Sequence, residues 1–294
     1  EIPGVVLRAI ADLPDEALHR GLAHLQAGEF LYETRLFPDL EYTFKHALTH
    51  EVAYGSLLQE RRRALHCRIV EAIEALHADR LAEHVERLGH HSLRGEVWDK
   101  AVAYLRQAGA KAMERSANQE AVAWIEHALD ALAHRPESRQ TVEQAVDFRR
   151  DLRNALLPLG ELGRLFERLQ EARALGESLG DPHRLARISC YMTQYFWVTR
   201  RYRDAITCGE LALAHDDLAI RVETNFFLGA SYYSLGAYHR AVDVLAQTVA
   251  WLGGSLAYER FGVPFLPAVT CRTWMAWCLA ELGAFPEAGA RADE

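Results

Sequence analysis

A spaced pattern of large, small and aromatic residues near the C-terminal end constrains the fold of this chain most strongly. It comprises Leu228-Gly229, Tyr232, Gly236, Ala241 and Leu245. A bulky residue, a small one and an aromatic residue one helical turn later are followed by a glycine break, and then by a small and a bulky residue. Two antiparallel helices need this order of sizes in order to approach closely and cross. The pattern therefore predicts a helical hairpin.

The same pattern recurs along the chain. Its most useful anchor is the small or apolar residue of the second helix, found at Ala121, Leu165, Ala205, Ala241 and Ala288. Large apolar residues lie thirteen positions before the last four anchors, at Leu152, Met192, Leu228 and Met275. Others lie nine positions before them, at Leu156, Phe196, Tyr232 and Leu279. The break five positions before these anchors is Gly160, Arg200, Gly236 and Gly283, so that Arg200 is the exception.

These hairpins are similar to the tetratricopeptide repeat (TPR), a two-helix unit of about 34 residues. The anchors are unevenly spaced, which indicates TPR-like units with loop insertions, the longest of them GGSLAYERFGVPFLP. We therefore predict a mainly all-α fold, a TPR-like α-α superhelix or solenoid. The resemblance implies that the first helices line a concave groove in which another protein binds.

Composition agrees with a helical chain and limits its location. Half of the residues are apolar and a quarter are charged, as in ordinary globular proteins. No apolar run approaches the roughly 20 residues that cross a bilayer, and we recognise no signal peptide. We expect a cytoplasmic protein without membrane contact, excised from a longer chain because it begins at Glu1. The net charge of −8 disfavours nucleic acid as the main partner.

The first eighty residues have a different character. Helical periodicity from Asp15 to Ala27 is followed by two short extended segments, Phe30–Arg35 and Leu40–Phe44. The turn-forming residues Phe37-Pro38-Asp39 separate these segments. A helix from about Ala47 and a second from Glu60 to Leu76 complete the order. A helix, a two-stranded wing and further helices are the outline of a winged-helix domain.

One block of this region resembles a specific family. It runs Tyr42-Thr-Phe44-Lys-His46-Ala-Leu48-Thr-His50-Glu51-Val-Ala-Tyr54, with Leu57-Leu58 and Arg61-Arg-Arg63-Ala-Leu65-His66 after it. This block is similar to STAND-type AAA ATPases, in particular to bacterial proteins that fuse a class III adenylate or guanylate cyclase, an ATPase and a TPR tail. The similarity extends from about Asp15 to Leu132. It implies a winged-helix-like segment and linking helix over residues 1–78 and a TPR-like repeat domain over 79–294.

The resemblance implies a regulatory role without catalysis. No G-x-x-x-x-G-K-[S/T] loop and no metal-binding aspartates of a cyclase are recognisable in the sequence. We therefore expect no enzymatic activity and no cofactor, and an intramolecular contact with an ATPase domain. In the wider family a winged-helix histidine contacts the phosphate of bound ADP, and His46 lies in a comparable place. The alternative is that His46 caps, or packs against, the helix that it opens.

Other candidate chemical groups favour no specific site. His46 and His50 lie four residues apart, but Glu51 follows them, whereas a metalloprotease helix has the order H-E-x-x-H. His84, His90 and His91 form a second cluster that lacks a ligand set of defined geometry. The five cysteines contain no C-x-x-C pair, which favours reduced, packed thiols. We predict no metal site, and we interpret the Arg61–Arg63 run as a solvated face or a contact to the ATPase.

The predicted groove supplies candidate binding residues. Counting from the anchors places eight side chains on its surface: Arg150, Asn154, Arg187, Gln194, Trp197, Phe226, Tyr233 and Trp277. Aromatic and long polar side chains suit the binding of a peptide. Arg150 and Asn154 resemble the carboxylate clamp of some TPR domains. The alternative for Trp197 and Trp277 is a place in the core between neighbouring units.

The function that these features favour is protein interaction. We expect a non-catalytic sensor arm of a cyclase–ATPase–TPR signalling protein, with a protein or peptide in the groove. Two alternatives remain open. One is the corresponding arm of a LuxR-type ATP-dependent transcriptional regulator, and the other is a scaffold for self-association. Sequence outside this segment would separate a cyclase from a transcription factor.

Overall fold

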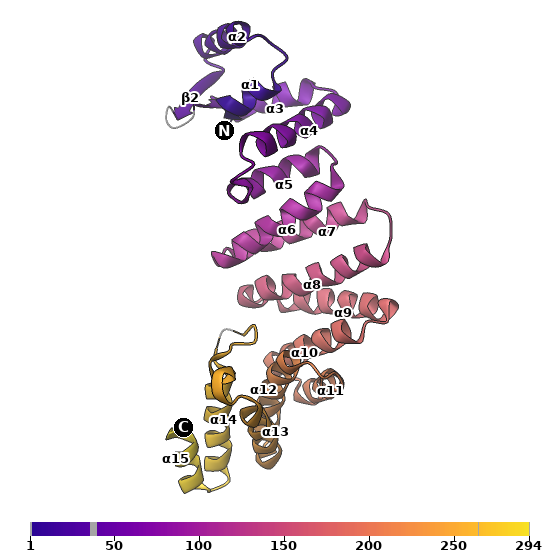
Figure 1. Ribbon diagram of the computed structural model, residues 1–294, viewed down its shortest axis with the longest axis vertical. Coiled ribbons are helices and arrows are strands. Elements are labelled where there is room, and N and C mark those ends of the chain that lie inside the picture. Colours follow the sequence, from indigo (N-terminus) through magenta and orange to yellow (C-terminus); the bar gives the residue numbers. More distant parts are fainter. Residues whose placement is uncertain (1, 36–39, 264, 294) are drawn as a thin grey trace. The chain divides into compact units, whose positions relative to one another are not determined.

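The computed structural model describes residues 2–35, 40–263 and 265–293 (Figure 1). By its internal contacts the chain divides into two compact units, residues 1–137 and residues 138–294, and each is described by itself below. The predicted boundary between residues 78 and 79 falls inside the first unit. The division into a winged-helix-like segment over residues 1–78 and a repeat domain over residues 79–294 stays a prediction.

The first unit combines a small sheet with helices. Its elements are β1 (Ile2–Pro3), α1 (Gly4–Ile10), α2 (Asp15–Ala27), β2 (Leu31–Arg35), β3 (Glu41–Phe44), α3 (Ala47–Ser56), α4 (Gln59–Leu76), the 3-10 turn η1 (Leu81–His84), α5 (Val85–Arg94), α6 (Trp98–Glu114) and α7 (Asn118–Ala133). The helices predicted at Asp15–Ala27, from Ala47 and to Leu76 are thereby confirmed.

The sheet is antiparallel, with the strand order β1-β3-β2. Leu31 pairs with Phe44 and Tyr32 with Thr43, and the register shifts between Glu33 and Arg35. The two predicted extended segments are therefore strands of one sheet. The two-residue strand β1 was not predicted, because it is too short to show alternation. The predicted turn at Phe37-Pro38-Asp39 lies outside the described residues.

The core of the first unit joins α1 to α4 and α5. Val6 packs with Val70, Ile73 and Leu88, all of them buried. Arg68 of α4 donates two hydrogen bonds of 2.7 Å to the carboxylate of Asp12, which follows α1. Apolar burial and this bidentate ion pair fix α1 on the face of α4.

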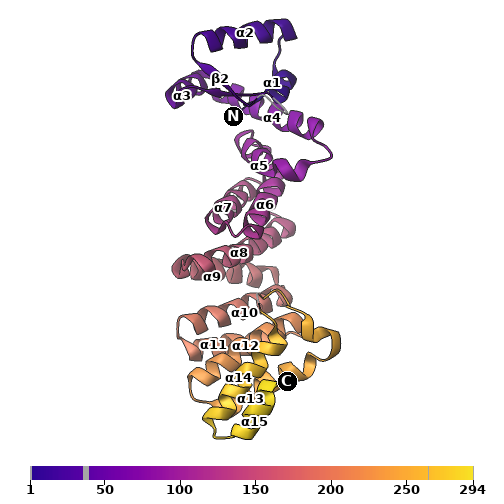
Figure 2. The ribbon, with the colours of Figure 1, turned by 90° about the vertical axis from the view of Figure 1, so that its left-hand side faces the viewer.

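The second unit is a series of antiparallel helix pairs (Figure 2). Its elements are α8 (Arg139–Leu159), α9 (Leu162–Leu179), α10 (Pro182–Val198), α11 (Tyr202–Leu213), α12 (Leu218–Ser234), α13 (Tyr238–Trp251), the 3-10 turn η2 (Gly254–Tyr258), α14 (Pro267–Glu281) and α15 (Phe285–Asp293). Each even-numbered helix packs against the next odd-numbered one, and α12 also contacts α10 and α14. Helix hairpins whose first helices touch have the architecture of TPR-like repeats.

The repeat pattern read from the sequence is confirmed by burial. All five anchors, Ala121, Leu165, Ala205, Ala241 and Ala288, are buried. The eight large residues that precede the last four anchors are buried as well. At Gly229 the two helices of one hairpin fit closely, since an added Cβ would lie 2.6 Å from Cγ of Leu245. Only glycine allows α12 and α13 to approach this far.

The break between the two helices has one backbone geometry in all copies. The residue five positions before each anchor has a positive φ, with 58° at Ser116, 71° at Gly160, 61° at Arg200, 74° at Gly236 and 79° at Gly283. Ser116 and Arg200 depart from the glycine pattern in sequence and still adopt the left-handed conformation. A non-glycine residue there costs about 1 kcal/mol or more, so packing of the flanking helices determines the turn.

One helix, α12, is enclosed on all sides. Every residue from 222 to 232 is buried, whereas an ordinary surface helix buries one face. The side chain of Asp217 accepts a 2.8 Å hydrogen bond from the Ile220 amide and so caps the N-terminus. Because α12 contacts α10, α11, α13 and α14, it is the centre of the second unit.

Candidate functional site

The predicted groove residues lie on the first helices of consecutive repeats. Arg150 and Asn154 are on α8, and Arg187, Gln194 and Trp197 are on α10. Phe226 and Tyr233 are on α12 and Trp277 is on α14. The structure divides them into two groups, one ionic and one aromatic.

The ionic group is centred on a buried carboxylate, Glu223 of α12, which is 4% exposed. Arg153 of α8 donates to Glu223 Oε1 over 3.1 Å and also to Gln194 of α10. Arg187 of α10 donates to Glu223 Oε2 over 3.5 Å and to Asp217 over 3.4 Å. A single carboxylate thus joins three consecutive first helices. Charged hydrogen bonds of this kind fix the spacing of the repeats.

Burial of this network shifts the pKa values of the ionisable side chains in it. The guanidinium carbon of Arg153 lies 4.2 Å from the centre of the Tyr191 ring. Burial, followed by the negative charge of Glu223, raises the pKa of Tyr191. Burial alone would raise the pKa of Asp217, but the Ile220 amide and Arg187 outweigh it and lower that pKa. Asp217 therefore remains charged and neutralises Arg187.

The resemblance of Arg150 and Asn154 to a carboxylate clamp is weakened by their partners. Arg150 lies 3.4 Å from Asp147 and 3.1 Å from Asp151, so its charge is balanced within its own helix. Asn154 is exposed, and its Oδ1 accepts a 2.8 Å hydrogen bond from Arg153. A ligand carboxylate would have to compete with two protein carboxylates for Arg150.

The aromatic group extends over α10, α12 and α14. The Trp274 ring is 6.3 Å from Trp197, 5.4 Å from Tyr233 and 5.2 Å from Trp277, measured between centroids. Trp197 is half-buried and also contacts Phe227, so it belongs partly to the core, as its alternative interpretation proposed. Trp277 is 50% exposed, which leaves its ring accessible.

Phe226 requires a correction to the expected exposure of the groove. The loop between α13 and α14 places Phe265 on it, with 4.7 Å between the ring centroids. Phe226 is therefore only 6% exposed. Its position on the groove-facing side of α12 was read from the repeat register, but the register carries no information about a loop that folds onto it.

Three residues of the site were missed by sequence reasoning: Arg153, Glu223 and Trp274. Glu223 had a recognisable signal, since it is the only charged residue in the stretch 222–233. A single carboxylate in an enclosed helix requires a cationic partner. Arg153 is adjacent to Asn154 and Trp274 lies three positions before Trp277, and only the contacts between helices identify them.

His46, the predicted nucleotide-sensing residue, precedes α3. Its carbonyl oxygen accepts from the amides of Thr49 (3.1 Å) and His50 (3.3 Å). Its side chain makes no capping hydrogen bond and is exposed. The backbone of His46 thus begins the helix, while the imidazole ring is accessible. Whether this ring contacts a nucleotide stays a prediction.

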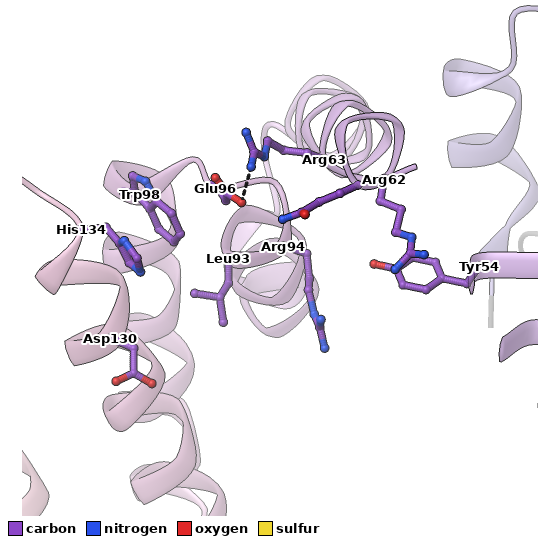
Figure 3. Close-up of a pocket in the computed structure, with 10 residues that line it drawn as sticks. Tyr54, Arg62, Arg63, Leu93, Arg94, Glu96, Trp98, Asp130 and His134 are labelled. Carbon is purple, nitrogen blue, oxygen red and sulfur yellow. Dashed lines mark hydrogen bonds and ion pairs between the residues drawn. The ribbon is translucent and has the colours of Figure 1, made fainter. Parts of the chain in front are cut away.

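The first unit contains a pocket of about 400 Å³, which lies between α4, α5, α6 and α7 (Figure 3). Arg63 donates to Glu96 over 2.7 Å, and Trp98 stacks on His134 with 4.1 Å between centroids. These two pairs occupy opposite parts of the pocket wall, and the Nε of Arg63 is buried without a hydrogen-bond partner. Figure 3 shows that Arg94 extends away from the Arg63–Glu96 pair.

The described part of the chain contains neither a cluster of metal ligands nor a helix suited to span a membrane. Among residues 2–35, 40–263 and 265–293, no three His, Cys, Asp or Glu side chains are grouped so that they could hold a metal ion. In the same ranges no helix combines the length and apolar composition of a membrane span. Four of the five cysteines are buried and all are free thiols.

Comparison of the sequence with known proteins gives one partial match. No protein-family model matches the chain. An uncharacterised protein of Rhizobium meliloti (strain 1021), R02095, is 33% identical over 143 residues, which cover 45% of this chain and 13% of that protein. The chain therefore spans only a small part of this relative.

Solved structures place the fold among TPR-like helical-repeat proteins. The TPR-like repeats of a putative kinesin light chain from Podosopora anserina are 18% identical, with a TM-score of 0.52, over 65% of this chain and 91% of that one. A Rap protein in complex with competence and sporulation factor is 14% identical, with a TM-score of 0.52, over 82% of this chain and 71% of that one. At these identities the likeness concerns the fold alone.

Proposed function

We propose that the chain is a protein-interaction arm without catalytic activity, and that the first helices of its second unit bind a protein or peptide. The observation that carries this proposal is the exposed Trp277 ring, beside Trp274 and Tyr233, on a repeat fold. Large aromatic rings that remain accessible are typical anchors of protein interfaces. The Rap protein of similar fold, whose structure contains competence and sporulation factor, supports a ligand in the groove.

The charges of the groove indicate what kind of ligand it accepts. Arg150, Arg153 and Arg187 are each bound to carboxylates of the protein. A ligand therefore gains little from an acidic group there. The accessible aromatic surface instead favours a peptide with an apolar or aromatic anchor residue, which would gain free energy by burying area on Trp277.

Selection from a displayed library of random peptides tests this function. Peptides enriched on the intact chain should carry an aromatic or aliphatic anchor, and Trp277→Ala should weaken their binding at least about tenfold, or about 1.4 kcal/mol. Trp124→Ala in α7 is the matched control, because this half-buried tryptophan is not part of the groove. Equal binding by the Trp277→Ala variant would exclude the groove as the binding surface.

We further propose that this arm belongs to a signalling ATPase of the cyclase–ATPase–TPR kind, with a winged-helix-like segment at residues 1–78. The element order α2-β2-β3-α3-α4 and the sequence from Phe44 to His66 support this assignment. Helix α3 has no buried residue, and Leu48 and Val52 are 68% and 65% exposed. Apolar exposure of this degree favours a contact with another domain.

The same proposal assigns His46 a contact with the phosphate of ADP bound to the ATPase domain. In the full-length parent protein, His46→Ala should then increase the dissociation rate of ADP several-fold, since one charged or polar contact is lost. His19→Ala on α2 is the control for loss of an exposed histidine. An unchanged dissociation rate for His46→Ala would remove this role and leave peptide binding by the groove untouched.

A further inference from the structure

A second cavity lies within the first unit, bordered by α1, β3, α3, α4 and α5. Its volume is about 560 Å³, within the range of about 300–1,000 Å³ that is typical of small-molecule sites. Two walls of different chemistry enclose it. Neither wall belongs to the groove of the second unit.

One wall is aliphatic. It consists of side chains of α1 and α4: Val6, Leu7, Ile10, Leu65, Ile69 and Ile73. Val6 and Ile73 are buried and the other four are half-buried. Leu65, Ile69 and Ile73 recur every four residues and so lie along one face of α4. A ligand with an aliphatic body would remove this surface from water.

The opposite wall is basic. Arg87, His90, His91 and Arg94 line the cavity from one face of α5, at the spacing i, i+3, i+4 and i+7. Within the described ranges neither Arg87 nor Arg94 forms an ion pair with a carboxylate, and no Asp or Glu lines the cavity. Arg62 also lines it, but this side chain donates to the carbonyl oxygens of Leu57 and Gly55.

The histidines at the cavity add little positive charge, because burial lowers the pKa of His66, His90 and His91. Tyr54 Oη lies 3.1 Å from His66 Nε2, and His66 Nδ1 lies 2.8 Å from His91 Nδ1. One Nδ1 must donate and the other accept, so the two rings cannot both be protonated. Burial, followed by neighbouring histidines and arginines, lowers the pKa of His66 to about 4 and that of His91 to about 3. The positive charge at the cavity therefore comes from the arginines.

We propose that this cavity binds a small organic anion with an aliphatic body, such as a carboxylate whose chain lies on α1 and α4 and whose head group is bound by Arg87 and Arg94. Two guanidinium groups without carboxylate partners match an anionic head, because each can donate two parallel hydrogen bonds. A purely ionic ligand such as phosphate has no apolar surface to bury on the aliphatic wall, so it lacks this contribution to binding. The basic wall distinguishes an anion from an alcohol of the same chain length.

Isothermal titration calorimetry of the intact chain tests the assignment with three probes: decanoate below its micellar concentration, 1-decanol and acetate. Decanoate should bind with a stoichiometry of one and at least about tenfold more tightly than decanol, because a charge-assisted bond contributes 1.4 kcal/mol or more. Acetate should not bind measurably. Equal affinities for decanoate and decanol, or no binding of decanoate, would overturn the proposal.

Two variants locate the binding site. Arg87→Gln combined with Arg94→Gln should weaken decanoate at least about tenfold and leave decanol unchanged, whereas the control Arg203→Gln on α11 should change neither. Ile69→Trp should weaken both probes by filling the cavity. Circular dichroism melting confirms that each variant is folded. Unchanged decanoate binding by the double arginine variant would show that the anion binds elsewhere.

Discussion

Arginines occur beside aromatic or apolar side chains both in the groove of the second unit and in the cavity of the first, yet they do different things there. In the groove Arg153 and Arg187 are bound to Glu223, and Arg150 is bound to Asp147 and Asp151. In the cavity Arg87 and Arg94 face an apolar wall that contains no carboxylate. The charges of the groove hold helices together, whereas those of the cavity remain available to a ligand.

The difference shows that an arginine is evidence for a ligand site only when it is known whether protein carboxylates already neutralise it. Sequence spacing identified Arg150 and Arg187 as candidates because of their positions in the repeat. The structure satisfies both of them internally, and it leaves the arginines of α5, which no repeat pattern marks, without an opposite charge. Four measurements test this contrast, and they follow in order of decreasing effect.

Removal of the central carboxylate should have the largest effect. Glu223→Ala leaves two arginines in a buried site without their partner, so we expect the free energy of unfolding to fall by about 3–5 kcal/mol. Urea denaturation followed by circular dichroism measures it. Glu210→Ala on the exposed face of α11 is the control and should change stability by less than about 0.5 kcal/mol. Similar effects of the two variants would mean that the network does not join the repeats.

Replacement of a small residue between two closely packed helices by a larger one should have the next largest effect. Ala241 is fully buried between α12 and α13, and Ala241→Leu should destabilise the chain by about 1–3 kcal/mol through overpacking. Ala250→Leu, on the exposed side of the same helix, controls for the change in helix propensity and side-chain size. A melting temperature that is unchanged by Ala241→Leu would contradict the repeat register.

Protonation of the histidines in the cavity wall should lower stability in acid. The folded-state pKa of His66 is about 4, below the value near 6.5 of an unfolded histidine. Between these values the unfolded chain binds the additional proton, so stability falls as the pH falls from 6.5 toward 4. Between pH 7 and pH 5 the loss from His66 is on the order of 2 kcal/mol.

The His66→Phe variant isolates this contribution. It lacks the titrating ring, so the difference in its unfolding free energy between pH 7 and pH 5 should be smaller than that of the unmodified chain by the same amount. His19→Phe on α2 is the matched control for an exposed histidine. An identical pH dependence of the chain with and without His66 would show that the pKa of this ring is the same in the folded and unfolded states.

The smallest effect is expected at the cavity arginines. Arg87→Gln removes no ion pair, so the free energy of unfolding should change by less than about 0.5 kcal/mol. The same substitution at Arg153, whose guanidinium is bound to a buried carboxylate, should cost several times more. Comparable losses for the two variants, measured by urea denaturation, would erase the distinction between the groove and the cavity.

The helices of the repeats could be predicted because their signals are local. A small anchor, two large residues before it and a break five residues before it all lie within one hairpin, and every anchor proved to be buried. The unusual Arg200 shows the limit of the residue pattern, since its backbone has the same positive φ as the glycines. Position in the hairpin, rather than residue type, specifies this turn.

The sites could be predicted only in part, because they depend on contacts between distant segments. Glu223 and Arg153 are on helices separated by a whole hairpin, and periodicity within each helix does not reveal their contact. The loop that places Phe265 on Phe226 has no repeat signal. The cavity combines α1, α4 and α5, and the sequence showed His90 and His91 only as a histidine cluster without defined ligand geometry.

The enclosure of α12 has a consequence for how the second unit opens. Amide hydrogens of residues 222–232 can exchange with solvent only when helices on several sides separate, so they should be the last to exchange in this unit. Helix α15, in which Ala288 is the buried residue among those described, should exchange early. A ligand bound near Trp277 would then slow exchange in α14 while leaving the already protected amides of α12 unchanged.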